Sequence, residues 1–525
     1  MKQTQNIQTF RKRYDAMKAE TQSWQSAWKE LSKYIAPTRG FFDGEQPNSG
    51  KKIDHRVLID SDPMLAVEVL SAGMMSGLTN PSRSWFELTL SDMQILKQNG
   101  VRNWLYEVRR RMEDVFGRSN VYNALHSFYQ EIAVFGTAAF LLEEDEEKII
   151  SCRNFTAGEY VLGINGRGEV NSFGREFFMT AEQMIQSFGK DNIPFSIQRS
   201  AAERQTKMFK VIHVILPNEE ADDEKLDFEH MPYSSVYFTE QGELIKKGGY
   251  HEFPVIAARW EVKNSSQVYG RSPGWKSLGD VKMLQKMQRS KLVALDKNIN
   301  PPMMVSANVQ GEVNLLPGGL TRYNGTTDAA VKPAYQVSID LASLENSIER
   351  VKQTIRGQFF ADVFLMLSNQ NFSHMTATEV AERHQEKMLV LGPVLERLKN
   401  ELLDPLIERT FAIMFRRGVI PLPPQIVEGE DIKVQYVSMI AQAQKASGMN
   451  AIGQGVDFVG NLAKASPEVL DKIDFDAAVE EGLDLLGVGA VLLRSEEETE
   501  KIRRQRSNLL IQGAENAGQK ISETI

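Results

Sequence analysis

The stretch that decides the fold runs from Ser338 to Gly418 and reads SIDLASLENSIERVKQTIRGQFFADVFLMLSNQNFSHMTATEVAERHQEKMLVLGPVLERLKNELLDPLIERTFAIMFRRG. Its first apolar residues recur three and four positions apart, which places them on one face of a helix; they are Leu341, Leu344, Ile348, Val351, Ile355 and Phe359. The polar run from Ser368 to His374 then interrupts the pattern with residues that favour loops. The stretch therefore predicts a helix, a short polar break and a second helix.

The second helix is predicted to be very long. Thr376 and Glu379 form a T-x-x-E capping box at its start, and apolar residues follow one face until Gly418, a natural helix stop. About forty residues in a helix span roughly 60 Å. Pro393 and Pro405 each remove one backbone hydrogen bond and are expected to bend the rod. A rod of this length needs neighbours along it, from this chain or from other copies.

Working outward, the rest of the chain predicts an α+β fold that is mainly helical. Apolar spacing and helix-start residues indicate further helices at residues 3–35, 62–77, 101–115, 121–133 and 275–298. From about residue 136 the pattern changes to short β-runs separated by glycine and charge clusters, namely 138–142, 160–164, 209–216, 235–238 and 254–260, with a late strand at 432–437. The acidic run Glu219–Glu224 is interpreted as a solvated loop, and the chain beyond Ser438 is expected to be helical and polar.

Length and composition bound the class of protein. With 525 residues the chain is long enough for roughly three domains, and an apolar fraction of 42% with 25% charged residues is ordinary for a soluble globular protein. The net charge of −8 argues against a generally basic DNA-coating protein but leaves room for a local basic patch. A single cysteine, Cys152, excludes an intramolecular disulfide. Without a signal core or a membrane-spanning run, we expect a soluble intracellular chain.

Known catalytic patterns are missing. No phosphate-binding G-x-x-x-x-G-K-[ST] loop, H-E-x-x-H motif or Cys/His zinc cluster is present, so we expect no enzyme activity, no cofactor and no metal. The strongest rival hypothesis is a metal-dependent nucleic-acid hydrolase that uses Asp54, His55, Asp60 and Asp62, because carboxylates and imidazole are suitable ligands. Helix capping and surface solvation explain these four residues more simply.

The predicted helix 275–298 is basic. It carries Lys276, Lys282, Lys286, Arg289, Lys291 and Lys297 against two aspartates, Asp280 and Asp296. Two interpretations stay open. The helix packs against acidic neighbours at the surface, or its cations face phosphates and supply sequence-independent attraction to DNA.

Five short stretches together resemble the portal, or head-to-tail connector, proteins of short-tailed bacteriophages. In chain order they are Tyr34–Gly40 (YIAPTRG), Leu78–Phe86 (LTNPSRSWF), Phe135–Ala138 (FGTA), Tyr269–Pro273 (YGRSP) and Met375–Val380 (MTATEV). Each stretch alone is weak, but five in the family's order across most of the chain are specific. The portion beyond about residue 450 is covered least.

The resemblance implies a ring, typically of twelve copies, at one capsid vertex, with an axial channel for double-stranded DNA. It implies the portal layout of wing, stem, clip and crown, as follows: wing 1–270, first stem helix 271–300, clip 301–338, second stem helix 339–362, tunnel loop 363–375, long wing helix 376–420, return strand 421–439 and crown 440–525. The expected partners are further copies of the chain, DNA, the terminase motor, tail adaptors, and capsid and scaffolding proteins, with no membrane. The expected location is the virion, and the host cytoplasm during assembly.

Site residues follow from this layout as expectations. The DNA channel is expected to be lined by Asn369, Gln370, Asn371 and His374 of the polar break and by Lys282, Lys286, Glu349, Gln353 and Arg356 of the stem. In the clip, the partner-binding residues are expected to be Glu312, Arg322, Tyr323 and Lys332. The alternative for the polar break is a buried hinge at a subunit interface, with Phe372 as its anchor. A second rival overall is another phage structural protein, such as a tail adaptor or scaffold, without a channel.

Overall fold

The structure is a computed structural model of the whole chain. It describes residues 2–42, 54–96, 98–203, 206–222, 224–225, 227–307, 309–316, 319–324, 331–334, 340–368, 390–427, 429, 431–436 and short pieces between 453 and 506.

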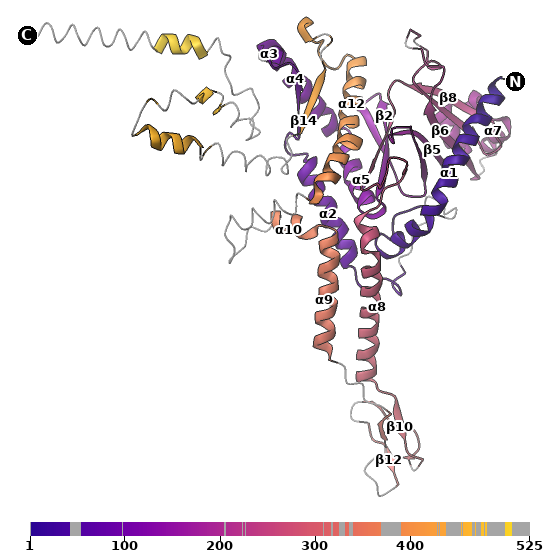
Figure 1. Cartoon of the computed structure of the whole chain (residues 1–525). Helices are drawn as coiled ribbons and strands as arrows, with labels where there is room; N and C mark the ends of the chain where they lie inside the picture. The colour runs from indigo at the N-terminus through magenta and orange to yellow at the C-terminus, as the bar shows by residue number, and fades with distance from the viewer. Residues whose placement is uncertain are drawn as a thin grey trace, which may run out of the picture.

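A body of helices and sheets carries a long two-helix projection (Figure 1). The helices that build the body are α1 (Lys2–Tyr34), α2 (Asp62–Leu78), α3 (Met93–Leu96), α4 (Asn99–Arg118), α5 (Val121–Phe135), α6 (Ala181–Phe188), α7 (Phe195–Ala202), α10 (Ala361–Ser368) and α12 (Asp404–Arg416). The projection, here called the stalk, is formed by α8 (Pro273–Ile299) and α9 (Leu341–Gln358), which lie side by side. The stalk ends in the tip, the described residues between 301 and 334.

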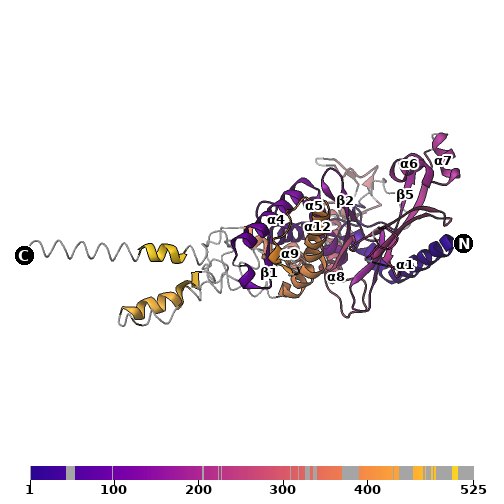
Figure 2. The ribbon, with the colours of Figure 1, turned by 90° about the horizontal axis from the view of Figure 1, so that it is seen from above.

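Three sheets lie in the body. An antiparallel five-stranded sheet has the order β4-β5-β6-β7-β8, a three-stranded sheet has the order β3-β2-β9, and β1 pairs with β14. The strands are β1 (Phe86–Leu90), β2 (Thr137–Asp145), β3 (Ile149–Phe155), β4 (Tyr160–Ile164), β5 (Val170–Thr180), β6 (Met208–Pro217), β7 (Tyr233–Thr239), β8 (Leu244–Tyr250), β9 (Val255–Arg259) and β14 (Ile432–Tyr436). Seen from above, α6 and α7 lie at the end of the body away from α4 (Figure 2).

Helix α1 contributes apolar side chains to two hydrophobic cores, one near its start and one near its end. Near its start, Phe10, Tyr14 and Met17 pack with Val214 and Phe238 of the five-stranded sheet. Near its end, a second set joins the main core around α2, α4, α5 and α12; it consists of Trp28, Leu31 and Ile35. The apolar spacing that predicted a helix at residues 3–35 therefore corresponds to a helix buried along one face.

The helices expected at residues 3–35, 62–77, 101–115, 121–133 and 275–298 and the late strand are present. The structure adds helices that had not been predicted, namely α3, α6 and α7. Strands β3, β5 and β8 had not been predicted. They pair with β2, β4 and β7, which had been predicted as strands. Residues 363–368 belong to α10, so the expectation of a loop starting at 363 is wrong for these six residues. The apolar run of α10 buries Val363 and Phe364 in the main core, which favours a helix over a solvated loop.

The long helix is described from residue 390, where residues 390–398 are helical. A π-helical turn (Lys399–Leu403) follows and leads into α12. Pro405 lies in the first turn of α12, where its missing N–H costs little, and the π turn lies just before it.

The predictions for residues 369–389, including the capping box at Thr376, concern residues outside the described part of the chain. Beyond residue 440, the described residues 455–463 and 499–506 are helical, as expected. In the part of the chain that is described, no helix combines the length and apolarity that a bilayer crossing requires.

Candidate functional site

The stalk begins on a rigid base. Ser272 caps α8, because its Oγ accepts a hydrogen bond from Trp275 N at 2.9 Å and donates one to Val134 O at 2.6 Å. Between the two helices, Lys291 Nζ pairs with Glu345 Oε1 at 2.6 Å and Gln358 Nε2 donates to Asp280 Oδ2 at 2.8 Å. The stalk helices are therefore tied to the body and to each other.

A junction forms where residues 54–61 cross the upper end of the stalk. Gln285 of α8 is buried there, and its Oε1 accepts from Ile59 N at 2.7 Å and from Asp60 N at 3.0 Å. Its Nε2 donates to Asp60 O at 2.8 Å. One glutamine side chain thus binds two N–H groups and one carbonyl of the same backbone segment, which fixes this segment against α8.

Two buried carboxylates then bind α9 to the same junction. Lys352 Nζ lies 2.7 Å from Asp60 Oδ2, and Gln288 Nε2 donates to the same oxygen at 2.7 Å. Arg356 binds Asp62, the first residue of α2. Burial opposes the ionisation of Asp60, but hydrogen bonds from Lys352, the Asp62 backbone and Gln288 outweigh it and lower its pKa.

These contacts contradict the metal-site hypothesis. Asp60 and Asp62 are occupied by cations of α9, and Asp54 pairs with Arg56 at 3.0 Å in an exposed turn. Among the residues that the structure describes, no group of three or more His, Cys, Asp or Glu side chains could hold a metal ion. The carboxylates serve as anchors for the stalk, and a hydrolase using them has no support.

The predicted channel residues of the stalk fall into two groups. Lys282 and Arg356 are engaged within the chain: Lys282 Nζ lies 2.8 Å from Glu30 Oε1, and Arg356 also contacts Glu349 Oε1 at 3.4 Å. Lys286 on α8, with Glu349 and Gln353 on α9, is exposed. Asn369, Gln370, Asn371 and His374 lie outside the described residues.

The stalk also exposes large apolar side chains that sequence analysis did not single out. Leu292 is 53% exposed and Val293 is 48% exposed, and both lie in the last third of α8. Met283 and Ile299 are exposed as well. The sequence could have indicated them, since the apolar residues of α8 surround the helix instead of following one stripe.

The described part of the tip consists of two short antiparallel ladders. Strand β10 (Met303–Val305) pairs with β13 (Val331–Pro333), and β11 (Val309–Gln310) pairs with β12 (Arg322–Tyr323). The predicted partner-binding residues Glu312, Arg322 and Lys332 are exposed, and the Tyr323 backbone pairs with Val309. Three exposed leucines were missed; they are Leu315, Leu316 and Leu320.

Two of the five stretches that carried the resemblance interlock. Gly136 adopts φ +82, and a Cβ on it would lie 2.4 Å from Gly270 O. Gly270 N donates to Thr137 Oγ1 at 2.8 Å, and Trp260 N donates to Gly136 O at 2.8 Å. The two backbones approach too closely for any side chain, which explains both glycines and sets where α8 starts.

A third stretch is held by a buried carboxylate. Arg39 Nη1 lies 2.9 Å from Glu131 Oε1 of α5, and Thr156 Oγ1 donates to the same oxygen at 2.8 Å. Burial raises the pKa of Glu131 even though Arg39 and these hydrogen bonds favour its charged form. Arg39 thereby fixes the turn that follows α1.

Another ion pair secures the π turn. Glu401 accepts from Arg259 of β9, with Nη2 at 2.6 Å and the Arg259 backbone N at 2.9 Å. Arg259 also donates to Gly168 O at 2.8 Å. Because the partners are far apart in the sequence, no local pattern could have indicated this contact.

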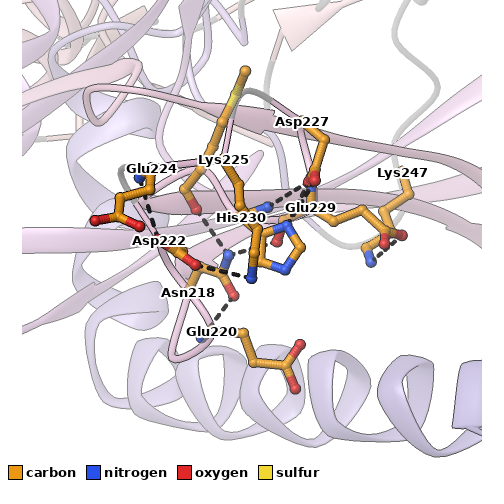
Figure 3. A network of polar contacts seen from close by, with 10 residues as sticks. Asn218, Glu220, Asp222, Glu224, Lys225, Asp227, Glu229, His230 and Lys247 are labelled. Atoms are coloured by element: carbon orange, nitrogen blue, oxygen red, sulfur yellow. Dashed lines mark hydrogen bonds and ion pairs between the residues drawn. The ribbon is translucent and has the colours of Figure 1, made fainter.

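The acidic loop between β6 and β7 is held by hydrogen bonds within the loop and by an ion pair of Glu229 with Lys247 of β8 (Figure 3). Asn218 Nδ2 donates to Glu229 O and Met231 O, each at 2.8 Å. His230 Nδ1 lies 2.7 Å from Asp227 Oδ1, and its hydrogen bond lowers the pKa of Asp227. Most of its charged side chains are exposed, as expected for a solvated loop.

Comparison with known proteins gives a consistent result. The family model described as "Bacteriophage head to tail connecting protein" matches residues 7–493. The chain is 39% identical over 523 residues to the "Probable portal protein" of Bordetella phage BPP-1, covering 96% of this chain and 93% of that protein. It is also 39% identical over 498 residues to the "Portal protein" of Salmonella phage epsilon15, covering 94% and 89%.

Solved structures with a distant likeness include a chain of "Neck of empty GTA particle computed with C6 symmetry", 10% identical with a TM-score of 0.39, covering 75% of this chain and 86% of that chain. A chain of "Neck of native GTA particle computed with C12 symmetry" is 10% identical with a TM-score of 0.37, covering 81% and 94%. The family match and the two portal proteins carry the assignment. The chain therefore belongs to the family of bacteriophage head to tail connecting proteins, a structural family without enzymatic activity, and its function is that of a phage portal.

Proposed function

We propose that the chain assembles into a ring of about twelve copies at one capsid vertex, where it forms the channel for DNA packaging and ejection. The observation that carries the proposal is 39% identity to portal proteins over 96% and 94% of this chain. The ring docks the terminase motor and later tail adaptors, and contacts capsid and scaffolding proteins during assembly in the host cytoplasm. In the mature virion it stays at the portal vertex.

The portal layout maps onto the described elements. In this proposal the body up to residue 270, together with β14, is the wing, and α8 and α9 are the stem helices. The tip is the clip. The polar break after α10 is the tunnel loop, α12 belongs to the long wing helix, and residues from about 440 form the crown.

Exposed apolar residues on the stalk support ring assembly. Two helices alone cannot bury apolar side chains that surround α8, and Leu292 and Val293 are about half exposed in the single chain. Burying the remaining half of each of these side chains contributes about 1 kcal/mol. Neighbouring stalks in a ring provide the missing cover, since a heterologous interface that closes on itself leaves no stalk uncovered.

The channel residues are proposed with different roles. Lys286, Glu349 and Gln353 are exposed and can contact DNA directly. Lys282 and Arg356 are held by Glu30 and Asp62, so they contribute to the stem mainly as anchors. Asn369, Gln370, Asn371 and His374 are proposed as the narrowest ring.

For the clip, we propose that Glu312, Arg322, Tyr323 and Lys332 contact the motor and the adaptors. The support is the position of the tip at the far end of the stalk, with exposed polar and apolar side chains. An end that no other described part of the chain covers is accessible to successive partners.

Native mass spectrometry and negative-stain imaging of the purified chain test the ring. We expect closed rings with a central hole, and we expect Val293→Asp to abolish them while the chain stays folded. Phe195→Asp is the matched control, because Phe195 is 80% exposed on α7, at the other end of the molecule. A parent chain that remains monomeric or dimeric at micromolar concentration contradicts the proposal.

A further inference from the structure

The connection between α9 and α10 contains an unusual backbone conformation. Helix α9 ends at Gln358, and Phe360 has φ +56 before α10 starts at Ala361. Phe360 N donates to Gly357 O at 3.1 Å, and Val363 N donates to Phe360 O at 3.0 Å. A left-handed aromatic residue is rare and persists only where surrounding contacts hold it.

The contact that holds α10 is a close crossing with α2. A Cβ built on Gly73 of α2 would lie 2.2 Å from Phe364 Cγ and 2.7 Å from Phe364 Cβ. Phe364 is 6% exposed. Its ring therefore occupies the space that any other residue at position 73 would need, so the crossing depends on a glycine.

The other side of the connection is anchored differently. Helix α9 is fixed through Lys352 with Asp60 and Arg356 with Asp62. The Phe360 ring lies against Trp260, with ring centroids 6.2 Å apart. A strained residue thus lies between one helix anchored by ion pairs and one anchored by apolar contacts, of which the crossing of Phe364 with Gly73 is the tightest.

We propose that Gly357–Phe360 is a hinge with two positions and that Phe364 on Gly73 is its latch. In the latched position, which the structure shows, α10 is docked on α2 and Phe360 is left-handed. In the released position Phe360 becomes right-handed, and α9 continues through residues 361–368 as one helix. Ala361 N–H then bonds to Gly357 C=O, as in any α-helix.

The consequence for the portal rests on the proposed function. Helix α10 ends at Ser368, directly before Asn369 of the proposed constriction. The latch therefore sets the direction from which the chain enters that constriction. Releasing it in every subunit changes the position of the constriction without breaking the stem.

Hydrogen–deuterium exchange of the purified chain tests the hinge. Gly73→Ala fills the space of the Phe364 ring, and Phe364→Ala removes the ring without adding bulk. Because a helix end that is no longer packed on α2 opens more often, we expect the amides of residues 361–368 to exchange on average at least about tenfold faster in both variants than in the parent, while α5 is unchanged. Gly279→Ala is the matched control, because this helical glycine of α8 has open space where its Cβ would lie.

A cross-link gives the reverse test. With Gly73→Cys and Phe364→Cys, the built Cβ separation of 2.7 Å is within about 1 Å of the usual disulfide range. Cys152 is buried, so it does not compete. Oxidation should return the exchange of residues 361–368 to the slow parent rate, and reduction should release it.

Two results overturn the hinge. The first is that residues 361–368 exchange no faster in Gly73→Ala and Phe364→Ala than in the control Gly279→Ala. The second is that the amides of α5 exchange faster by the same factor as those of residues 361–368. Both measurements are made without DNA, so they do not depend on the channel. If exchange changes as expected but DNA packaging by the variants does not, the hinge stands and the proposed constriction fails.

Discussion

Asp60 shows how one residue positions the stalk. Its side chain is 8% exposed and accepts from Lys352 of α9 and Gln288 of α8, while its backbone is held by Gln285. A single carboxylate therefore fixes both stalk helices relative to the body. The sequence had suggested Asp60 as a possible metal ligand. Its actual cationic partner, Lys352, lies almost 300 residues later in the chain, where no local pattern reveals it.

Removing this carboxylate should destabilise the junction. Asp60→Ala leaves the Lys352 ammonium and the Gln288 amide without a buried acceptor, and we expect the free energy of unfolding to fall by about 2–4 kcal/mol. Urea unfolding followed by fluorescence measures the change. Asp54→Ala is the control, since the Asp54–Arg56 pair is exposed and should not contribute measurably. Equal midpoints for the two variants would contradict the role of Asp60.

Glu131 gives a pH dependence of defined sign. Burial raises its pKa above the ordinary 4.5, so the folded state binds a proton more tightly than the unfolded state. The stability of the parent relative to Glu131→Gln should therefore increase as the pH falls from about 7 to about 5, and level off below the ordinary value. Unfolding midpoints of both proteins across this range measure it. A relative stability that decreases on acidification would refute the direction.

At the scale of elements, the loop between α10 and the long helix is expected to touch passing DNA. Asn369, Gln370 and Asn371 are short, polar and uncharged, so they can hydrogen-bond phosphate or water without holding either tightly. Changing all three to alanine should preserve rings while altering DNA packaging or retention. Changing all three to lysine should slow DNA passage in a salt-sensitive way, because each phosphate contact releases counterions.

Packaging assays with purified components at two salt concentrations distinguish these outcomes. Ser196→Lys is the control, because it adds a charge on the exposed surface of α7, far from the stalk. If both loop variants package and retain DNA like the parent, the loop is not the constriction. The alternative, a buried hinge anchored by Phe372 between subunits, then gains support.

The tip is expected to act as an independent docking element. Each described strand of the tip pairs with another strand of the tip and with no described strand of the body, so deleting residues 308–330 should leave the body folded. We expect the deletion to abolish binding of the terminase motor and of tail adaptors. Co-sedimentation with each partner measures binding, and circular dichroism checks the fold. Undiminished docking would remove the clip assignment.

The sequence predicted secondary-structure elements better than it predicted contacts between residues far apart in the chain. Long helices such as α1 and α8 were placed within a few residues, because their apolar spacing and their caps are local. Strand β8 (Leu244–Tyr250) was missed because two lysines and two glycines hide its pattern, and its pairing with β7 overrides that local preference. Two ion pairs could not be predicted, since no local pattern indicates a distant partner; they join Arg259 to Glu401 and Lys352 to Asp60.

At the scale of the whole molecule, charge opposes tight DNA binding. The chain carries −8, so twelve copies would carry about −96. Such a ring repels DNA over most of its surface and allows it to slide through a few local contacts. We expect purified rings to show little binding to double-stranded DNA in a gel-shift assay at physiological salt. Tight, sequence-independent binding under these conditions would contradict a sliding channel.

The pairing of β1 with β14 has a consequence for synthesis of the chain. Phe86 is paired with Tyr436, about 350 residues later. Ribosomes add roughly 5–20 residues per second, so β1 waits for its partner for about 20 to 70 s. During this time Trp85 lacks the ring of Tyr436, on which it stacks in the finished fold. The nascent body therefore stays incomplete until the stalk and tip have already left the ribosome.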